Sequence, residues 1–559
     1  MEEFLNSWKR YFTFAALLSC FVNALQLTFP FYMFTIYRNV VISYSGYSLG
    51  CITFAACYAL VCFGVFHYVR SRLLARAGAD LHHKLRSKVF KGLIETNVVA
   101  GNRAYSQGMA DIGTLREFFA SQAVYPLFDL PWAPFYLLLI FFIHPVLGLI
   151  AFLGAAFVLG LGALQEFLIR GSMTDANRWN AKNQRFVNAF LRNTEVINGM
   201  GMTEAVADWF DRNHDRVISN QTQSSKYAGA IQSVIKPMQN VIQVLIYCAG
   251  AYYAMLEGFS VGLMVAASII MGRGLAPIMQ ATSSWKFIVQ ARQAYQRVQS
   301  FEKKLDARIE RMELPEIEGR VSSEGATYVS GGRPLVANVS FVLASGEFMG
   351  ILGPSGAGKT TLCKLILGVW PCSAGRVSLD GMDSFLWNKE SAGKKIGYLP
   401  QEVELFPATV AENIARLGEV DMEEVQAAVE ICGIQPLIES LPAGYDTYLE
   451  TEGGVKLSGG QKQIIGMAMA LYGNPSLLIL DEPTSNLDEQ AEAVLMKALA
   501  NIQQKKKTTC IMVTHKPELL RAMDKILVMK QGRVARFGPK NEVFAELAGQ
   551  NQQQAKDAI

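Results

Sequence analysis

The segment Gly353–Thr360 constrains the fold more than any other stretch of the chain. It reads Gly-Pro-Ser-Gly-Ala-Gly-Lys-Thr and matches the phosphate-binding pattern G-x-x-x-x-G-K-[ST]. The apolar run Phe348–Leu352 precedes it, and residues 361–367 repeat apolar side chains at helical spacing. The loop is therefore predicted to join a buried strand to a helix, which is the context that this motif requires.

The residue types in this loop suit a polyphosphate. Glycines allow backbone N–H groups to turn towards an anion, and the start of the helix adds partial positive charge. Lys359 can reach the outer phosphates, and the Thr360 hydroxyl is the expected ligand of Mg²⁺. A glycine-rich turn without a ligand is the alternative. The candidate nucleotide-binding residues are Gly353, Pro354, Ser355, Gly356, Ala357, Gly358, Lys359, Thr360 and Thr361.

Composition points to a membrane protein with more than one domain. A chain of 559 residues is too long for a single core. Its hydrophobic fraction is 51%, and its mean hydropathy is positive. A net charge of +4 is too small to indicate a nucleic-acid partner. The nine cysteines show no C-x-x-C spacing, so we expect free thiols without disulfides or zinc.

The first half contains six apolar runs that are interpreted as membrane spans. A soluble domain with six long core helices is the alternative, and the placement of Lys and Arg argues against it. Basic residues cluster before the first run and after the second and fourth, whereas the short outer loops hold only Arg38. The positive-inside rule therefore places both termini in the cytoplasm. The predicted spans are residues 12–36, 47–69, 125–143, 146–165, 241–256 and 261–281.

The two long inner segments, 70–124 and 166–240, are predicted to be helical extensions of the spans. Each has a polar break near its middle, around 101–113 and around 198–203. Antiparallel helices would turn at these breaks, and we hypothesise that the turns contact a second domain.

Two charged residues fall within the predicted spans. Asp129 lies near the start of the third, and Arg273 lies inside the sixth between two glycines and shortly before Pro277. A charge at the bilayer centre costs about 2.5–3.5 kcal/mol on insertion scales, so such residues usually face a polar cavity or a partner. Arg273 and Asp129 are therefore candidates for lining a translocation pathway, with structural pairing as the alternative for each.

The second half alternates strands and helices in a doubly wound α/β pattern that antiparallel strands interrupt. Residues 1–305 are predicted to form the membrane domain, 306–317 a linker, 318–548 the nucleotide-binding domain and 549–559 a flexible tail. The fold class is thus a helical six-span membrane domain followed by an α/β P-loop domain.

Polar residues follow several apolar runs of this second half. Asp481 and Glu482 follow the run 477–480, where a central parallel strand would end beside the phosphate loop. Asp481 suits Mg²⁺, and Glu482 can accept the proton of an attacking water or orient that water. Gln401 and His515 also follow predicted strands and would lie near the γ-phosphate.

Two further features complete the candidate site. The segment Leu457-Ser458-Gly459-Gly460-Gln461 precedes a helix and would form a second anion site. Because one polyphosphate already has its own loop, this segment is best explained as facing another subunit; a helix cap without a ligand is the alternative. Tyr328 precedes the phosphate loop and could stack on adenine.

Taken together, these motifs resemble the nucleotide-binding domain of ABC transporters. They are Gly353–Thr360, Gln401, Leu457–Gln461, Leu477–Glu482, Ser485–Asp488 and His515. The six preceding spans resemble an exporter half-transporter, and details such as 198–203 and 514–517 resemble the type I secretion ATPases of the protease-secreting, PrtD-like branch. One departure is that Ile464 and Met469 stand where the family usually has arginine. Altered packing rather than lost activity is expected there.

The resemblance implies a homodimer that binds ATP and Mg²⁺ between the phosphate loop of one subunit and the signature segment Leu457–Gln461 of the other. Catalytic roles are implied for Glu482, His515 and Gln401, metal contacts for Thr360, Gln401 and Asp481, and a role between subunits for Asp488. Its implied partners are the lipid bilayer of a bacterial inner membrane, a periplasmic adaptor (membrane fusion protein), an outer-membrane channel and a secreted, unfolded polypeptide. The chain begins shortly before the first span, so a peptidase-like N-terminal domain is not expected. Export of lipids or drugs, and an ATP-gated channel or regulatory membrane protein, remain alternatives.

Overall fold

The computed structural model describes residues 2–100, 108–306, 317–449, 455–485, 487 and 489–546. The chain divides into two compact units, one within residues 1–306 and the other C-terminal to residue 306 except for the short segment 98–102. Most of the predicted linker 306–317 and the whole tail 549–559 fall outside the described residues. Each unit is described below by itself.

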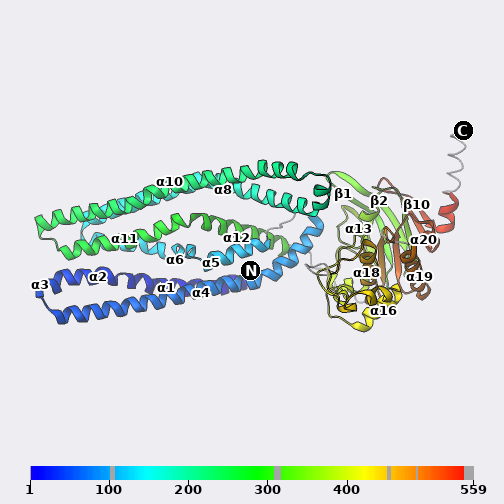
Figure 1. Cartoon of the computed structure of the whole chain (residues 1–559), viewed down its shortest axis with the longest axis horizontal. Helices are drawn as coiled ribbons and strands as arrows, with labels where there is room; N and C mark the ends of the chain where they lie inside the picture. Colours follow the sequence, from blue (N-terminus) through cyan, green and yellow to red (C-terminus); the bar gives the residue numbers. More distant parts are fainter. Residues whose placement is uncertain are drawn as a thin grey trace. The chain divides into compact units, whose positions relative to one another are not determined.

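The N-terminal unit consists of helices, several of which are far longer than a bilayer is thick. Figure 1 shows α8 and α10 running alongside each other over much of their length. The helices are α1 (Glu2–Gln26), α2 (Thr28–Thr35), α3 (Val41–Ser43), α4 (Gly46–Ala100), α5 (Gly108–Ala120), α6 (Pro126–Asp129), α7 (Ala133–Ile143), α8 (Pro145–Arg192), α9 (Thr194–Gly199), α10 (Thr203–Glu257), α11 (Val261–Ser283) and α12 (Trp285–Asp306).

Five segments in the described part of the chain are long and apolar enough to cross a membrane. They are Lys9–Ser43, Gly46–Glu95, Gln122–Ile143, Pro145–Arg192 and Val261–Ser283. The predicted span 241–256 is the C-terminal part of α10 and is not among them. Gln243 lowers the hydropathy of that stretch, and the polar Asn240 directly precedes it. Its membrane crossing therefore stays a prediction.

Proline shapes the start of the third predicted span. The predicted span 125–143 consists of a short α6, a 3₁₀ turn at Leu130–Trp132 and then α7. Pro126, Pro131 and Pro134 each remove a backbone donor, which explains the interruption. By contrast, α11 continues as an α-helix through Pro277. The polar break at the second inner tip is confirmed, because α9 ends at Gly199 and α10 begins at Thr203.

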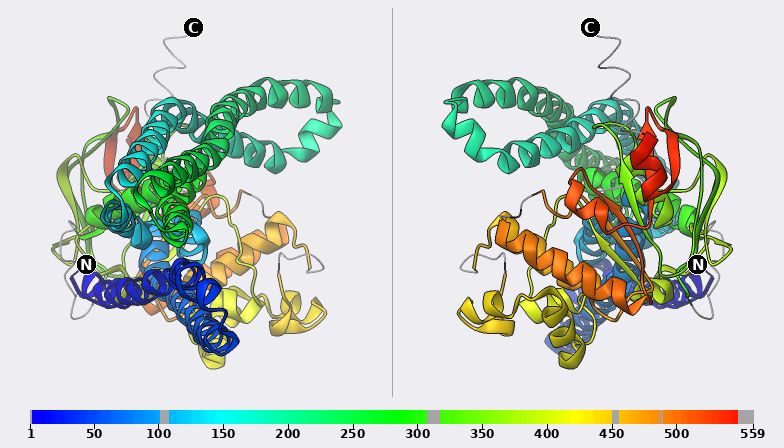
Figure 2. Two further views of the ribbon diagram at one scale, coloured as in Figure 1. Left: turned by 90° about the vertical axis from the view of Figure 1, so that its left-hand side faces the viewer. Right: turned by 90° about the vertical axis from the view of Figure 1, so that its right-hand side faces the viewer.

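Two separate apolar clusters hold the helical unit together. One contains α5 and the inner parts of α4 and α12, with Leu81, Ile112 and Ala294 at its centre. The other joins α7, α8, α10 and α11 around Tyr136, Ile235 and Met271. Figure 2 shows α8 and α10 as a projecting hairpin. Internal packing therefore groups the helices into two sets.

The C-terminal unit contains two sheets. The smaller one is antiparallel, with the order β2-β1-β4-β5. Its strands are β1 (Val321–Ser330), β2 (Arg333–Leu343), β4 (Ala374–Leu379) and β5 (Met382–Asp383). The larger has the order β10-β9-β3-β8-β7-β6 and is parallel except for β10. Its strands are β3 (Phe348–Leu352), β6 (Ile396–Leu399), β7 (Leu477–Asp481), β8 (Thr509–Val513), β9 (Lys525–Lys530) and β10 (Arg533–Pro539).

The central strands of the larger sheet are buried on both faces, as expected for parallel strands that read as continuous apolar runs. Alternate residues such as Leu478 and Leu480 face α16 (Met422–Cys432), α18 (Gly459–Leu471) and α19 (Glu489–Lys505). Leu477 and Ile479 face the opposite cluster, which includes α13 (Lys359–Ile366) and the smaller sheet. This double burial fixes the strand ends, and the polar residues that follow β3, β6, β7 and β8 meet at one edge.

Candidate functional site

The phosphate loop follows β3 and leads into α13, as the motif predicted. Gly358 has φ +93°, and a Cβ there would lie 2.5 Å from the Leu335 carbonyl oxygen. A Cβ at Gly353 would lie 2.3 Å from the Met529 carbonyl oxygen. These two positions therefore require glycine. At Gly356, with φ +78°, a Cβ would meet no atom within 4 Å, so this side of the loop is open.

Lys359 is only 7% exposed and turns back over its own loop. Its ammonium group donates to the carbonyl oxygens of Gly353 at 2.6 Å and Pro354 at 3.2 Å. The Nζ atom also lies 3.1 Å from Nε2 of His515. The cation is thus held by neutral acceptors and is available to an anionic group, which would bind it more strongly.

Glu482 lies at the centre of the polar edge. Its Oε2 accepts a hydrogen bond from Nε2 of Gln401 at 2.9 Å, and its Oε1 lies 3.8 Å from Nε2 of His515. The structure therefore connects Gln401, Glu482, His515 and Lys359 in one chain of contacts. Sequence reasoning predicted that these residues gather, because each follows a parallel strand or opens the helix after one.

The backbone of Glu482 adopts φ +51°, which is unusual for a residue with a side chain. Such a conformation costs about 1–3 kcal/mol and persists only where the surroundings fix it. Its N–H donates to the Val513 carbonyl oxygen at 3.0 Å, and its carbonyl accepts from the Ser485 N–H at 3.2 Å. The strand β8 and the turn after β7 therefore hold this residue in a strained orientation.

Asp481, the last residue of β7, has the properties of a metal ligand. It is 1% exposed, and neither carboxylate oxygen has a hydrogen-bond partner among the described residues. Burial raises its pKa, while the Thr360 hydroxyl and the Lys359 cation act in the opposite direction. A buried carboxylate with free acceptor capacity beside a hydroxyl fits a hard cation such as Mg²⁺. The chemistry of these two residues thus fits the predicted metal.

The signature segment caps α18 through a reciprocal pair of hydrogen bonds. The Ser458 hydroxyl accepts from the Gln461 N–H, and the Gln461 side chain accepts from the Ser458 N–H. Ser458 and Gly459 are exposed, so the start of this helix faces outwards. An exposed, positively polarised helix start is available to an anion that another molecule supplies. The predicted residue Asp488 lies outside the described residues.

Tyr328 does not present a free ring. It stacks on Trp370 with the ring centroids 4.9 Å apart and an angle of 15° between the planes. The ammonium group of Lys364 lies 4.7 Å from the Trp370 ring as well. The predicted contact of Tyr328 with adenine therefore becomes a proposal that the stacked pair of Tyr328 and Trp370 contacts adenine.

The two intramembrane charges differ sharply. Asp129 is buried and accepts hydrogen bonds from Arg70 at 2.7 Å and from Asn23 at 2.9 Å. Arg70 is 2% exposed, donates also to Ser19, and lies over the Tyr125 ring at 4.5 Å. This geometry favours the structural alternative for Asp129. Arg273 is exposed on α11 and forms no ion pair within the described ranges.

Sequence reasoning missed several residues that shape these sites. Arg70 counted only as a cytoplasmic cation; an opposite charge at the end of a neighbouring span was the available signal. Gln463 donates from α18 to the Glu482 carbonyl at 3.2 Å and was detectable as a polar residue on an apolar helical face. Arg416 uses all its N–H groups on the carbonyls of Gly393, Ile396, Met469, Ala470 and Tyr472. No sequence pattern indicated that contact.

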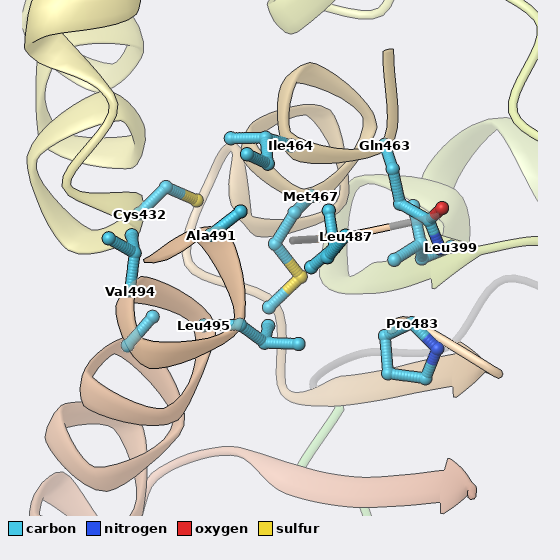
Figure 3. Close-up of a pocket in the computed structure, with 11 residues that line it drawn as sticks. Leu399, Cys432, Gln463, Ile464, Met467, Pro483, Leu487, Ala491, Val494 and Leu495 are labelled. Carbon is cyan, nitrogen blue, oxygen red and sulfur yellow. The ribbon is translucent and has the colours of Figure 1, made fainter. Parts of the chain in front are cut away.

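A small cavity of about 10 Å³ lies beside α18. Figure 3 shows its lining from α18, α19 and the turn after β7, with Gln463, Ile464, Met467 and Pro483 labelled. Ile464, one of the two departures from the family pattern, therefore packs against apolar neighbours. Met469, the other, supplies a carbonyl oxygen to Arg416.

Comparison with known proteins supports both units. Residues 336–485 match the family model described as ABC transporter, and residues 12–273 match the ABC transporter transmembrane region. The type I secretion system ATP-binding protein PrsD of Rhizobium meliloti (strain 1021) is 33% identical over 97% of this chain and 93% of its own length. The alpha-hemolysin translocation ATP-binding protein HlyB of Escherichia coli O157:H7 is 27% identical over 94% of this chain and 76% of its own length.

The fold is also that of a solved structure, a bacterial Atm1-family ABC exporter with ATP bound. The two share a TM-score of 0.82 and 22% identity over 99% of this chain and 98% of that one. At this identity the likeness establishes the fold only.

Proposed function

The chain belongs to the ABC transporters, as an integral membrane exporter that hydrolyses ATP, and on this premise we propose that it exports an unfolded polypeptide. The proposed assembly is a homodimer in the bacterial inner membrane with both termini in the cytoplasm. Its proposed partners are a periplasmic adaptor and an outer-membrane channel. The observation that carries this proposal is the similarity, along nearly the whole chain, to a type I secretion ATP-binding protein and to a haemolysin translocation protein.

The proposed mechanism assigns a role to each site residue. The open loop Gly353–Thr361 would bind the phosphates of ATP, with the Lys359 cation moving from its backbone acceptors to the outer phosphates. Thr360, Gln401 and Asp481 would hold Mg²⁺, which neutralises phosphate charge when bound. Glu482 would accept the proton of the attacking water, and His515, already 3.1 Å from the Lys359 ammonium, would contact the γ-phosphate. Asp488 is proposed to act at the boundary between subunits.

The dimer is proposed because the start of the signature segment is exposed and its reciprocal hydrogen bonds cap its own helix, which leaves it available to a nucleotide on another subunit. In a head-to-tail pair, Ser458–Gln461 of one subunit would face the nucleotide held by Gly353–Thr360 of the other. Closure on ATP and reopening after hydrolysis would then move the membrane helices.

Mixed dimers test this composite site. The variant Ser458→Arg should bind ATP as a single subunit but not hydrolyse it, and Lys359→Ala should bind ATP weakly. A dimer of one variant with the other retains one intact phosphate loop opposite one intact signature, so it should hydrolyse ATP faster than either variant alone. Assembled mixed dimers without any recovery would mean either that the composite site is wrong or that both sites must work together.

The class of cargo is tested by stimulation of ATP hydrolysis in proteoliposomes. An unfolded polypeptide should raise the rate, whereas the same polypeptide locked in a folded state by an internal disulfide should not. Glu482→Gln proteoliposomes provide the control for contaminating ATPases. Stimulation by lipids or small amphiphilic drugs alone would assign the chain to lipid or drug export instead.

Arg273 is proposed to face the translocation pathway. It is exposed on α11 and has no carboxylate partner among the described residues, and an unpaired charge in a span requires water or cargo beside it. Arg273→Ala should leave basal hydrolysis intact and reduce stimulation by cargo. A cysteine at position 273 in a cysteine-free background should react with an impermeant thiol reagent applied from both faces. Protection in both the nucleotide-free and the ATP-trapped states would contradict this role.

A further inference from the structure

Helix α18 contacts the machinery of two different ATP sites in the proposed dimer. Its start, Ser458–Gln461, is exposed and would face the nucleotide of the partner subunit. Further along the same helix, Gln463 reaches the residue that acts on the nucleotide of its own subunit. The side chain of Gln463 is 2% exposed, and its Nε2 atom donates to the Glu482 carbonyl oxygen at 3.2 Å.

The orientation of the Gln463 amide follows from this contact. A carbonyl oxygen can only accept a hydrogen bond, so the amide nitrogen must face Glu482. The amide oxygen is buried and has no partner among the described residues. Burial of an unsatisfied acceptor is unfavourable, and an apolar side chain of similar shape would avoid it. A glutamine at position 463 is therefore best explained by the hydrogen bond that its amide nitrogen donates.

The contact acts on a backbone that is already strained. Glu482 has φ +51°, and its N–H and carbonyl are held by Val513 and Ser485, which lie on β8 and on the turn after β7. Gln463 adds a restraint from α18, and Gln401 holds the carboxylate at 2.9 Å. The orientation of the Glu482 carboxylate consequently depends on the position of α18.

Hydrogen bonds satisfy backbone groups at both ends of helix α18. The reciprocal cap of Ser458 and Gln461 closes its start, and Arg416 binds the carbonyl oxygens of Met469, Ala470 and Tyr472 at its end. Gln463 lies two residues beyond Gln461, in the first turns that the cap keeps helical. A displacement of the start of α18 would therefore be transmitted to Gln463.

We propose that Gln463 is a positioning residue that aligns Glu482 and, through α18, makes this alignment respond to the nucleotide held by the partner subunit. The inference rests on the proposed composite site. ATP engaged by the signature segment would pull α18, and the Gln463 amide would carry that shift to the Glu482 backbone. Each ATP site would thus sense the occupancy of the other without a direct contact between the nucleotides.

The test replaces the donor while keeping the volume. In purified Gln463→Met, kcat for ATP should fall about tenfold or more, because a small misplacement of a reacting group has effects of this size or larger. KM and the melting temperature should stay close to those of the wild type. The matched control is Met467→Leu, which lines the same small cavity and should leave kcat unchanged. Gln463→Leu, which also removes the donor, should show the same loss and serves if the Met variant is unstable.

The link between sites has its own measurement. The Hill coefficient for ATP should exceed one in the wild-type dimer and fall towards one in both Gln463 variants. An unchanged kcat would overturn the positioning role, and a lower kcat with an unchanged Hill coefficient would overturn the link through α18. The assay contains no cargo, so it is independent of the polypeptide hypothesis. A wild-type protein without ATP hydrolysis would instead contradict the proposed function itself.

Discussion

The nucleotide site and the intramembrane cluster around Asp129 both bury charge, yet they treat it in opposite ways. Asp129 receives hydrogen bonds from Arg70 and Asn23, and Tyr136 donates in turn to the Asn23 carbonyl. Asp481 is buried just as deeply, but neither of its oxygens has a partner among the described residues. A satisfied buried charge supports the architecture, whereas an unsatisfied one is typical of a ligand site.

The same distinction separates residues within each unit. In the C-terminal unit, Arg416 donates all its N–H groups to backbone carbonyls, while Lys359 donates to neutral acceptors beside the open loop. In the helical unit, Arg70 is paired, whereas Arg273 forms no ion pair with any residue that the structure describes. Four substitutions test whether a charged group with a full set of hydrogen-bond partners is structural and one without such partners is functional.

Glu482→Gln should have the largest effect. Removing the proposed base should lower the steady-state hydrolysis rate by about 10²–10⁴-fold, while ATP affinity is retained because the shape is preserved. The measurement is phosphate release by the purified dimer, together with nucleotide binding at equilibrium. Glu518→Gln, an exposed carboxylate on α20 (Pro517–Arg521), is the matched control. Near-normal turnover would show that the base lies elsewhere.

Asp129→Leu should chiefly affect folding. Removing one partner of a buried ion pair leaves Arg70 uncompensated, at a cost of about 3–5 kcal/mol. The yield of detergent-stable protein and its melting temperature should therefore fall. The double variant Arg70→Met, Asp129→Leu should recover much of the loss, because no isolated charge remains. A stable Asp129→Leu protein that hydrolyses ATP but fails to export would instead move Asp129 into the pathway.

Arg416→Ala should destabilise the C-terminal unit by about 2 kcal/mol, since several carbonyl acceptors lose a charged donor. Burial lowers the pKa of Arg416, but the guanidinium remains charged at any working pH. Denaturant unfolding compares it with Arg521→Ala, a helix-terminal arginine of the same unit. Equal midpoints for the two variants would mean that the carbonyl contacts add nothing.

Asp481→Asn should give the smallest change in stability, and the direction of the change in melting temperature tests the assignment. Burial raises the pKa of Asp481 in the folded state, so its contribution to stability is present below the unfolded pKa and is lost as pH rises through the folded value. At neutral pH the ionised carboxylate thus destabilises the nucleotide-free protein. The asparagine variant should melt at a higher temperature at pH 7, and this difference should vanish in acid. Mg²⁺-dependent hydrolysis should be lost, and a lower melting temperature at pH 7 would contradict the assignment.

Sequence reasoning predicted that the candidate site residues gather at one edge of the sheet, because the rule behind that prediction is local. A polar residue directly after an apolar parallel strand can lie only at one edge of the sheet, and this rule placed Gln401, Asp481, Glu482 and His515. The helical character of the long inner segments was predictable for the same reason. Contacts between distant elements could not be predicted, because the spacing of apolar residues does not indicate which helices face each other. Arg70 and Asp129 are 59 residues apart, and Arg416 reaches carbonyls up to 56 residues away.

The broken start of the third span also bears on how the protein enters the membrane. Arg70 lies on α4 and precedes Asp129 in the chain, so it reaches the bilayer first during synthesis. Asp129 follows within a short, proline-interrupted segment instead of a rigid helix. Such a segment can change conformation until the Asp129 carboxylate pairs with the Arg70 guanidinium. Helix α7 can then pack in its final position. Substitutions that straighten this segment, such as Pro131→Leu, should therefore delay membrane integration in a co-translational insertion assay while both partners of the Arg70–Asp129 ion pair remain present.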